Sequence, residues 1–175
     1  MKLYQIIMTH NRPWTAREIV AFLLIFLAAA ILSGILFKHN KLVLSQVIAV
    51  LTLLTFLAIV FASTVFTRTP SSEHTYELEF FWSWKQVFQG NKALFEENLL
   101  NIILLFPAGL LLPVIYRKTL SWQKGFFSGA FISFGIEFLQ LVLARGLFEW
   151  DDIVHNGLGC MAGCIISSHF LKNKM

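Results

Sequence analysis

One stretch of the chain, residues 131–163, places polar and charged side chains inside otherwise apolar sequence. Glu137 and Gln140 interrupt one apolar run and stand three residues apart, on neighbouring points of one helix face. Asp152 and Asn156 stand four apart at the start of the next run and share a face in the same way. A carboxylate in such a run costs about 2.5–3.5 kcal/mol on insertion scales, so it persists where it faces protein or water. This stretch is therefore the predicted working site.

Each of these residues has two interpretations. Glu137 is either a general base or charged ligand contact, or a structural group bonded to an asparagine. Gln140 either contacts a ligand or bridges two helices by hydrogen bonds. Arg145 either pairs with Asp152 or binds an anionic group such as phosphate through its planar fork, and its place at a helix exit favours the ligand.

Other residues in the stretch are better explained by structure. Asp151 suits the N-terminus of a helix, where a carboxylate caps backbone N–H groups and matches the helix dipole. His155 has no second His or Cys at ligand spacing, so no metal site and no cofactor is predicted. Cys160 and Cys164 lie four apart on an apolar helix and are read as small packing residues. No known catalytic signature occurs in the sequence.

The composition describes a membrane protein. Of 175 residues, 57% are hydrophobic and only 14% are charged, and the mean hydropathy is positive. The net charge is +4, and the Lys and Arg residues stand at the ends of apolar runs. These residues form no continuous basic face. Nucleic acid is therefore not expected as a partner.

Five apolar runs are long enough to cross the hydrocarbon core of roughly 30 Å. They cover residues 19–37, 42–66, 94–116, 122–144 and 153–171. The first run continues past the three alanines at 28–30, which argues against a cleaved signal peptide. With no repeat and no linker, residues 1–175 are predicted to form a single integral membrane domain, an all-α bundle of about five transmembrane helices.

Two segments of this bundle are expected to be irregular. Pro107 and Pro113 each remove a backbone donor from the third helix, so a kink or a break is predicted between residues 103 and 109, with Asn101 close to the freed carbonyls. The loop at residues 67–92 contains the aromatic block Phe80 to Trp84. It is read first as a belt segment lying at the membrane interface, and alternatively as a lid over a site at the membrane surface.

The distribution of basic residues favours a multi-pass protein with a cytoplasmic C-terminus and an outward-facing site. The loops on one side carry only basic charges. These are Lys38, Lys41, Arg117, Lys118, Lys124, Lys172 and Lys174. The N-terminal Lys2, Arg12 and Arg17 argue for the opposite orientation.

Three linked motifs resemble the VanZ-like family. They are the segment NIILLFPAGLLLP at residues 101–113, Glu137 with Gln140, and Arg145 followed by DIVHN at 152–156 with Gly159 beyond it. The resemblance covers about residues 67–166, and Arg68 also fits the family pattern. That family is named for an accessory protein that confers low-level teicoplanin resistance. The resemblance thus implies a cell-membrane protein that contributes to glycopeptide resistance.

The first functional hypothesis is a binding protein, in which Arg68, Asn101, Gln140, Arg145 and Asn156 line a polar intramembrane cavity. Its expected ligand has an anionic head and is a membrane lipid or a lipid-linked cell-wall precursor, with the glycopeptide antibiotic itself as a further candidate partner. The second is an enzyme acting on such a head group, with Glu137 or Asp152 as general base and Arg145 stabilising the anionic transition state. A transporter is disfavoured because there is no internal repeat. Gly159 and Gly163 form a small-xxx-small face for close helix contact within the bundle or in a homo-oligomer.

Overall fold

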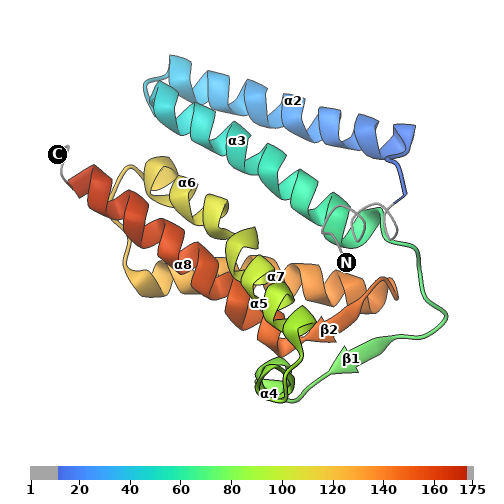
Figure 1. Cartoon of the computed structure of the whole chain (residues 1–175). Coiled ribbons are helices and arrows are strands. Elements are labelled where there is room, and N and C mark those ends of the chain that lie inside the picture. Colours follow the sequence, from blue (N-terminus) through green and yellow to red (C-terminus); the bar gives the residue numbers. More distant parts are fainter. Residues whose placement is uncertain (1–11, 173–175) are drawn as a thin grey trace.

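The computed structural model describes residues 12–172, which form an all-α fold with one pair of very short strands (Figure 1). In chain order the elements are α2 (Ala16–Lys38), α3 (Leu44–Phe61), the π-helix η1 (Ala62–Phe66), β1 (Thr75–Glu77), α4 (Trp82–Phe88), α5 (Lys92–Leu104), α6 (Phe106–Tyr116), α7 (Trp122–Val142), β2 (Leu147–Glu149) and α8 (Trp150–Lys172). The predicted all-α membrane fold is confirmed.

Helices α2 and α3 form a hairpin on the outside of the fold (Figure 1). A capping box starts α2, in which Thr15 accepts a hydrogen bond from Glu18 N and Glu18 accepts one from Thr15 N. Most of α2 is exposed, with only Ser33 buried, as expected of a helix whose apolar side chains face lipid. The other helix of the pair, α3, packs on α6, and Gln46 Nε2 donates to Ile115 O at 2.7 Å.

The third predicted helix is broken rather than gently kinked. The first part, α5, ends at Leu104, and Leu105 leaves helical geometry with ψ of 6° before α6 begins at Phe106. Pro107 lies in the first turn of α6, where its missing N–H costs no intrahelical bond. The predicted irregularity is confirmed. The expected role of Asn101 is wrong, because its amide donates to Asp152 and not to a carbonyl freed by proline.

Helix α8 lies against α5, α6 and α7 and contacts them through small residues. A Cβ on Gly159 would stand 1.7 Å from Ile102 O, and one on Gly163 would stand 2.2 Å from Phe106 O. On the other side of α8, Cys160 and Cys164 are free, buried and packed against glycines of α7. The small-xxx-small face is thus used inside the chain, and a homo-oligomer would need another surface.

Within residues 12–172, four helices are long and apolar enough to cross a membrane: α2, α3 with η1, α5 with α6, and α7. Helix α8 has 23 residues but a more polar sequence, which fits its central place because protein surrounds much of it. The fifth crossing therefore remains a prediction.

The strands were not anticipated from the sequence. They pair in parallel, with Thr75 opposite Leu147, Tyr76 opposite Phe148 and Glu77 opposite Glu149. Each has three residues, too few to show the alternation that marks a strand. The pair ties the long loop after η1 to the turn between α7 and α8, at the end of the bundle that carries the predicted site.

Candidate functional site

A cavity of about 200 Å³ lies among the ends of η1, α5, α7 and α8, beside β2 and α4. Six of the seven residues predicted to form the site line it, namely Arg68, Asn101, Glu137, Gln140, Asp152 and Asn156. The remaining lining residues are Thr64, Trp82, Leu94, Glu97, Leu104, Ile136, Leu147 and Glu149. Polar groups from five helices (η1, α4, α5, α7 and α8), from β2 and from the loop after η1 therefore face one space.

The polar side chains of the cavity are held by hydrogen bonds to one another and to the backbone. Asn101 Nδ2 donates to Asp152 Oδ1 at 2.5 Å, and Gln140 Nε2 donates to Thr64 O at 3.1 Å. Glu137 is only 2% exposed, and its Oε2 accepts from Glu149 N at 3.1 Å. These bonds fix the side chains before any ligand arrives, as a binding or catalytic site requires.

Asn156 has one side of its amide satisfied and the other without a partner. Its Nδ2 donates to Ser133 Oγ at 2.9 Å, and that hydroxyl donates in turn to Asp152 O. Its Oδ1 is buried and accepts no hydrogen bond within residues 12–172. A buried acceptor without a donor costs free energy, so this carbonyl is a point where a ligand or a water molecule would bind favourably.

Carboxyl groups outnumber basic groups around the cavity. Four of them line it, on Glu97, Glu137, Glu149 and Asp152, whereas Arg68 supplies the single guanidinium among the lining residues. Within residues 12–172 Arg68 forms no salt bridge with any of the four. The charge around the cavity is thus mixed, and it suits a simple anionic head less well than the sequence suggested.

Sequence reasoning missed three of the polar lining residues. Glu97 stands four residues before Asn101, so helical spacing already placed the two on one face. Glu149 lies between two predicted helices, close to Asp151, where the direction of its side chain could not be inferred from the sequence. Trp82 belongs to the aromatic block and reaches the site because its Nε1 donates to Glu149 Oε1 at 2.7 Å.

Glu149 is the lining carboxyl that lies between helices. Burial, and after it the negative charge of Asp152, raise the pKa of Glu149 from its ordinary value of 4.5 to about 8, while the bond from Trp82 opposes the rise. At neutral pH this group therefore holds its proton in much of the population.

The aromatic block folds over the cavity as a short helix, α4. Asp151 holds it in place, since its carboxylate accepts from Phe81 N at 2.5 Å, Ser83 N at 3.0 Å and Ser83 Oγ at 2.6 Å. Asp151 was expected to cap its own helix, α8. That expectation is wrong, because Asp151 caps α4 from a distance of about 70 residues in sequence.

The tryptophans of α4 complete this cover. Trp82 lines the cavity, and Trp84 Nε1 donates to His155 Nε2 at 2.8 Å. Phe80, Phe81 and Phe88 stay exposed, as an interfacial belt requires. One face of the segment therefore contributes to the wall of the cavity, while its position at the membrane interface and its role as a lid remain predictions.

Arg145 is the predicted site residue that does not line the cavity. Its Nη1 donates to Phe66 O at 2.5 Å and to Val65 O at 3.3 Å, at the end of η1. Arg12 Nη2 donates to the same Phe66 carbonyl at 3.0 Å. The alternative pairing of Arg145 with Asp152 is absent from the described residues, whose two salt bridges join Arg12 to Glu18 and Lys85 to Glu79. The loop arginine supports backbone carbonyls at the end of a helix.

A comparison with protein-family models gives one match, to VanZ/LLP1, over residues 24–171. The chain belongs to the VanZ/LLP1 family. The match includes α3 and most of α2 in addition to the region from residue 67 onward that carries the polar motifs. Comparisons with curated proteins and with solved structures give no match.

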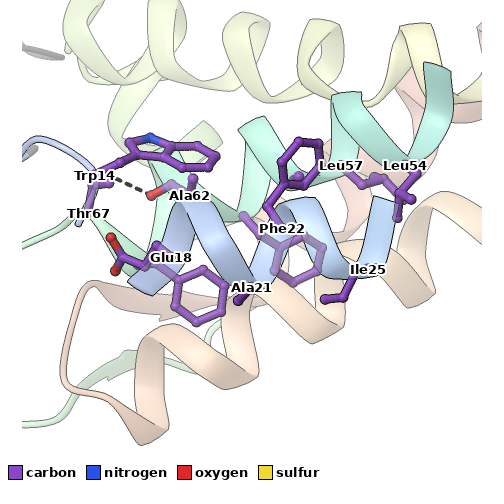
Figure 2. Close-up of a pocket in the computed structure, with 12 residues that line it drawn as sticks. Trp14, Glu18, Ala21, Phe22, Ile25, Leu54, Leu57, Ala62 and Thr67 are labelled. Atoms are coloured by element: carbon purple, nitrogen blue, oxygen red, sulfur yellow. Dashed lines mark hydrogen bonds between the residues drawn. The ribbon is translucent and has the colours of Figure 1, made fainter. Parts of the chain in front are cut away.

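This VanZ/LLP1 member also has an apolar groove of about 470 Å³ between α2 and α3 (Figure 2). Phe22, Ile25, Leu54 and Leu57 line its length, and Trp14, Glu18 and Thr67 stand at one end. Thr67 Oγ1 donates to Ala62 O at 2.7 Å within η1. Because η1 contributes residues to both the groove and the polar cavity, the two spaces lie at the same end of the bundle.

The described part of this VanZ/LLP1 chain contains no set of side chains arranged to bind a metal ion. Within residues 12–172 there is no group of three or more His, Cys, Asp or Glu residues that could hold an ion. His155 uses Nε2 to accept from Trp84, and its Nδ1 is buried without a partner.

Proposed function

We propose that this VanZ/LLP1 protein binds the head group of a membrane lipid or lipid-linked cell-wall precursor in the polar cavity. The observation that carries the proposal is the cavity itself, which gathers ionisable and amide side chains from several helices at the end of an apolar bundle. Burying ionisable side chains inside a membrane bundle costs free energy unless they contact a protein partner or a ligand. The unpartnered carbonyl of Asn156 and the unpaired guanidinium of Arg68 provide sites for that ligand.

The volume of the cavity favours a head group over a whole antibiotic. Pockets for drug-sized ligands hold roughly 300–1,000 Å³, and this cavity holds about 200 Å³. A glycopeptide is larger than an ordinary drug, so it does not fit inside. Resistance would then follow from the lipid or precursor that the protein engages, which changes the susceptibility of the envelope to lipoglycopeptides.

The test compares lipid retention with drug susceptibility in matched variants. Arg68→Gln removes the guanidinium of the cavity, whereas Arg117→Gln removes an exposed one outside it. Lipids that co-purify with each protein are identified by mass spectrometry, and teicoplanin susceptibility is measured in cells at equal expression. We expect Arg68→Gln to lose both the bound lipid and the protection, and Arg117→Gln to keep both. Equal lipid content in the two variants would contradict the proposal.

An enzymatic function is the second candidate, because Glu137 and Asp152 face one cavity from adjacent helices. Either carboxylate would act as general base toward water or a hydroxyl, and Arg68 would take the role of anion stabiliser that the sequence had given to Arg145. Long incubation of the purified protein with its co-purifying lipid separates the candidates. A chemically altered lipid, absent with Glu137→Gln, would establish the enzyme.

A further inference from the structure

We infer that the head group bound in this cavity carries a protonated primary amine beside a phosphodiester, as in an aminophospholipid. The inference rests on the proposed function and names the ligand chemistry of the same site. It follows from which hydrogen-bond donors and acceptors of the cavity already have partners in the protein and which do not.

Each of the three side-chain amides of the cavity donates one hydrogen bond to the protein. Asn101 Nδ2 donates to the carboxylate of Asp152, and Gln140 Nε2 donates to the carbonyl of Thr64. Asn156 Nδ2 donates to Ser133 Oγ. The partners of Asn101 and Gln140 are oxygens that accept only, so the orientation of these two amides is fixed by chemistry. The amide atom that is buried without a hydrogen-bond partner within residues 12–172 is the carbonyl oxygen of Asn156, which is an acceptor.

The other polar atoms of the cavity strengthen this bias toward acceptors. The indole N–H of Trp82, which lines the cavity, already donates its hydrogen bond to Glu149. The carboxyl groups of Glu97, Glu137 and Asp152 add further acceptor oxygens. Asn156 is 2% exposed and its Oδ1 lacks any donor within residues 12–172. An ammonium group, with three N–H donors and a positive charge, matches this environment in both hydrogen bonding and charge.

The guanidinium of Arg68 favours an anionic group close to that amine. Arg68 lines the cavity, and its Nη1 lies 3.0 Å from the point where a Cβ on Gly146 would stand. Gln140 Oε1 lies 2.8 Å from the same point. A hydrogen-bond donor of Arg68 and a hydrogen-bond acceptor of Gln140 therefore both lie close to Gly146. A guanidinium binds a phosphate through two parallel hydrogen bonds. A ligand with phosphate and ammonium in one head group therefore satisfies both kinds of charge.

The lipid comparison uses full-length protein in detergent and native mass spectrometry. The protein is offered equal amounts of phosphatidylethanolamine, phosphatidylglycerol and N-acetylated phosphatidylethanolamine, which keeps the phosphate but loses the cationic amine. We expect about tenfold stronger retention of phosphatidylethanolamine, the ratio that about 1.4 kcal/mol gives. Equal retention of all three, or a preference for phosphatidylglycerol, would overturn the amine while leaving lipid binding in place. Retention of none of the three would also overturn the inference, whereas the proposed function is refuted separately, by equal lipid content in the Arg68→Gln and Arg117→Gln proteins.

One variant locates the amine, with a control one residue away. Glu97→Gln removes a carboxylate that lines the cavity and forms no hydrogen bond within residues 12–172. Glu96→Gln changes an exposed neighbour that does not line the cavity. We expect Glu97→Gln to reduce the preference for phosphatidylethanolamine over its N-acetylated form, and Glu96→Gln to leave it unchanged. An unchanged preference in Glu97→Gln would overturn the assignment.

Discussion

Arg68 and Arg145 both lie near the end of η1, but their guanidinium groups have different surroundings. Arg145 donates to Val65 O and Phe66 O, carbonyls that a helix end leaves without a partner. Arg68 lines the cavity and forms no salt bridge among the described residues. One arginine therefore supports the fold, and the other remains available for a ligand.

Replacing each arginine with glutamine should separate these roles. Arg145→Gln removes a donor from Val65 O and leaves Phe66 O with its bond from Arg12 alone, so we expect it to lower the free energy of unfolding by about 1–3 kcal/mol. Arg68→Gln should stay within about 0.5 kcal/mol of wild type. Thermal melting of both proteins in detergent, followed by circular dichroism, measures the difference. A larger loss for Arg68→Gln would show that Arg68 has the structural role.

Glu149 should make stability depend on pH. The unfolded chain releases this proton near the ordinary value of 4.5, whereas the folded protein keeps it until pH reaches about 8. Between these values the folded state binds more protons, so stability falls as pH rises from about 4.5 to about 8. Asp152, Glu97 and Asp151 act on Glu149 in the same direction through their negative charges.

The neutral variant Glu149→Gln should remove much of this dependence. We expect its melting temperature to change less than that of wild type between about pH 5 and pH 8, because no buried carboxylate forms at this position. Its side-chain oxygen can still accept from Trp82. Glu96→Gln, at an exposed position, serves as the control and should follow wild type. Identical slopes for Glu149→Gln and wild type would contradict the assignment.

At the scale of elements, the sequence predicted helices and the faces that carry polar groups, because Glu137, Gln140 and Asp152 interrupt apolar runs at helical spacing. It did not predict how loops are held. The direction of Arg145 depends on the carbonyls at the end of η1, and a π-helical turn leaves no pattern in the sequence. Asp151 was assigned to its own helix because a cap formed across the fold has no local signal.

The attachment of α4 should fail when Asp151 is removed. Asp151→Ala leaves the N–H groups of Phe81 and Ser83 and the hydroxyl of Ser83 without their acceptor, at an expected cost of about 1–3 kcal/mol. We expect α4 to open, with faster proteolysis between residues 78 and 91 and a red shift of tryptophan emission. Asp151→Asn keeps one acceptor oxygen and should fall between the alanine variant and wild type. Unchanged proteolysis of Asp151→Ala would show that other contacts hold α4.

The contact of α8 with α5 and α6 should tolerate no added carbon. In Gly159→Ala the new Cβ would stand 1.7 Å from Ile102 O, a backbone atom that moves only if the helices separate. We expect a loss of at least about 2 kcal/mol or failure to fold. Gly34→Ala in α2 meets nothing within 4 Å and should match wild type or gain up to about 1 kcal/mol. Melting temperature and folded yield measure both variants, and equal melting would contradict this packing.

At the scale of the whole molecule, the two ends of the described fold differ in charge, because one carries basic residues without acidic ones and the other carries both. Figure 1 shows the turn between α2 and α3, the connection from α6 to α7 and the end of α8 on one side, with η1, β1, β2 and α4 on the other. The first side carries Lys38, Lys41, Arg117, Lys118, Lys124 and Lys172. An excess of Lys and Arg in short loops marks the cytoplasmic face, so we expect the cavity to open outward, where it would meet lipids and precursors of the outer leaflet.

Labelling of introduced cysteines tests this orientation. Glu73 lies on the cavity side and Lys118 on the basic side, and both are exposed. The two native cysteines are buried in the bundle, so wild type gives the background. With a maleimide that cannot cross membranes, Glu73→Cys should react in intact cells, and Lys118→Cys should react only after permeabilisation. The reverse pattern would place the cavity in the cytoplasm, and the ligand would then have to come from the inner leaflet.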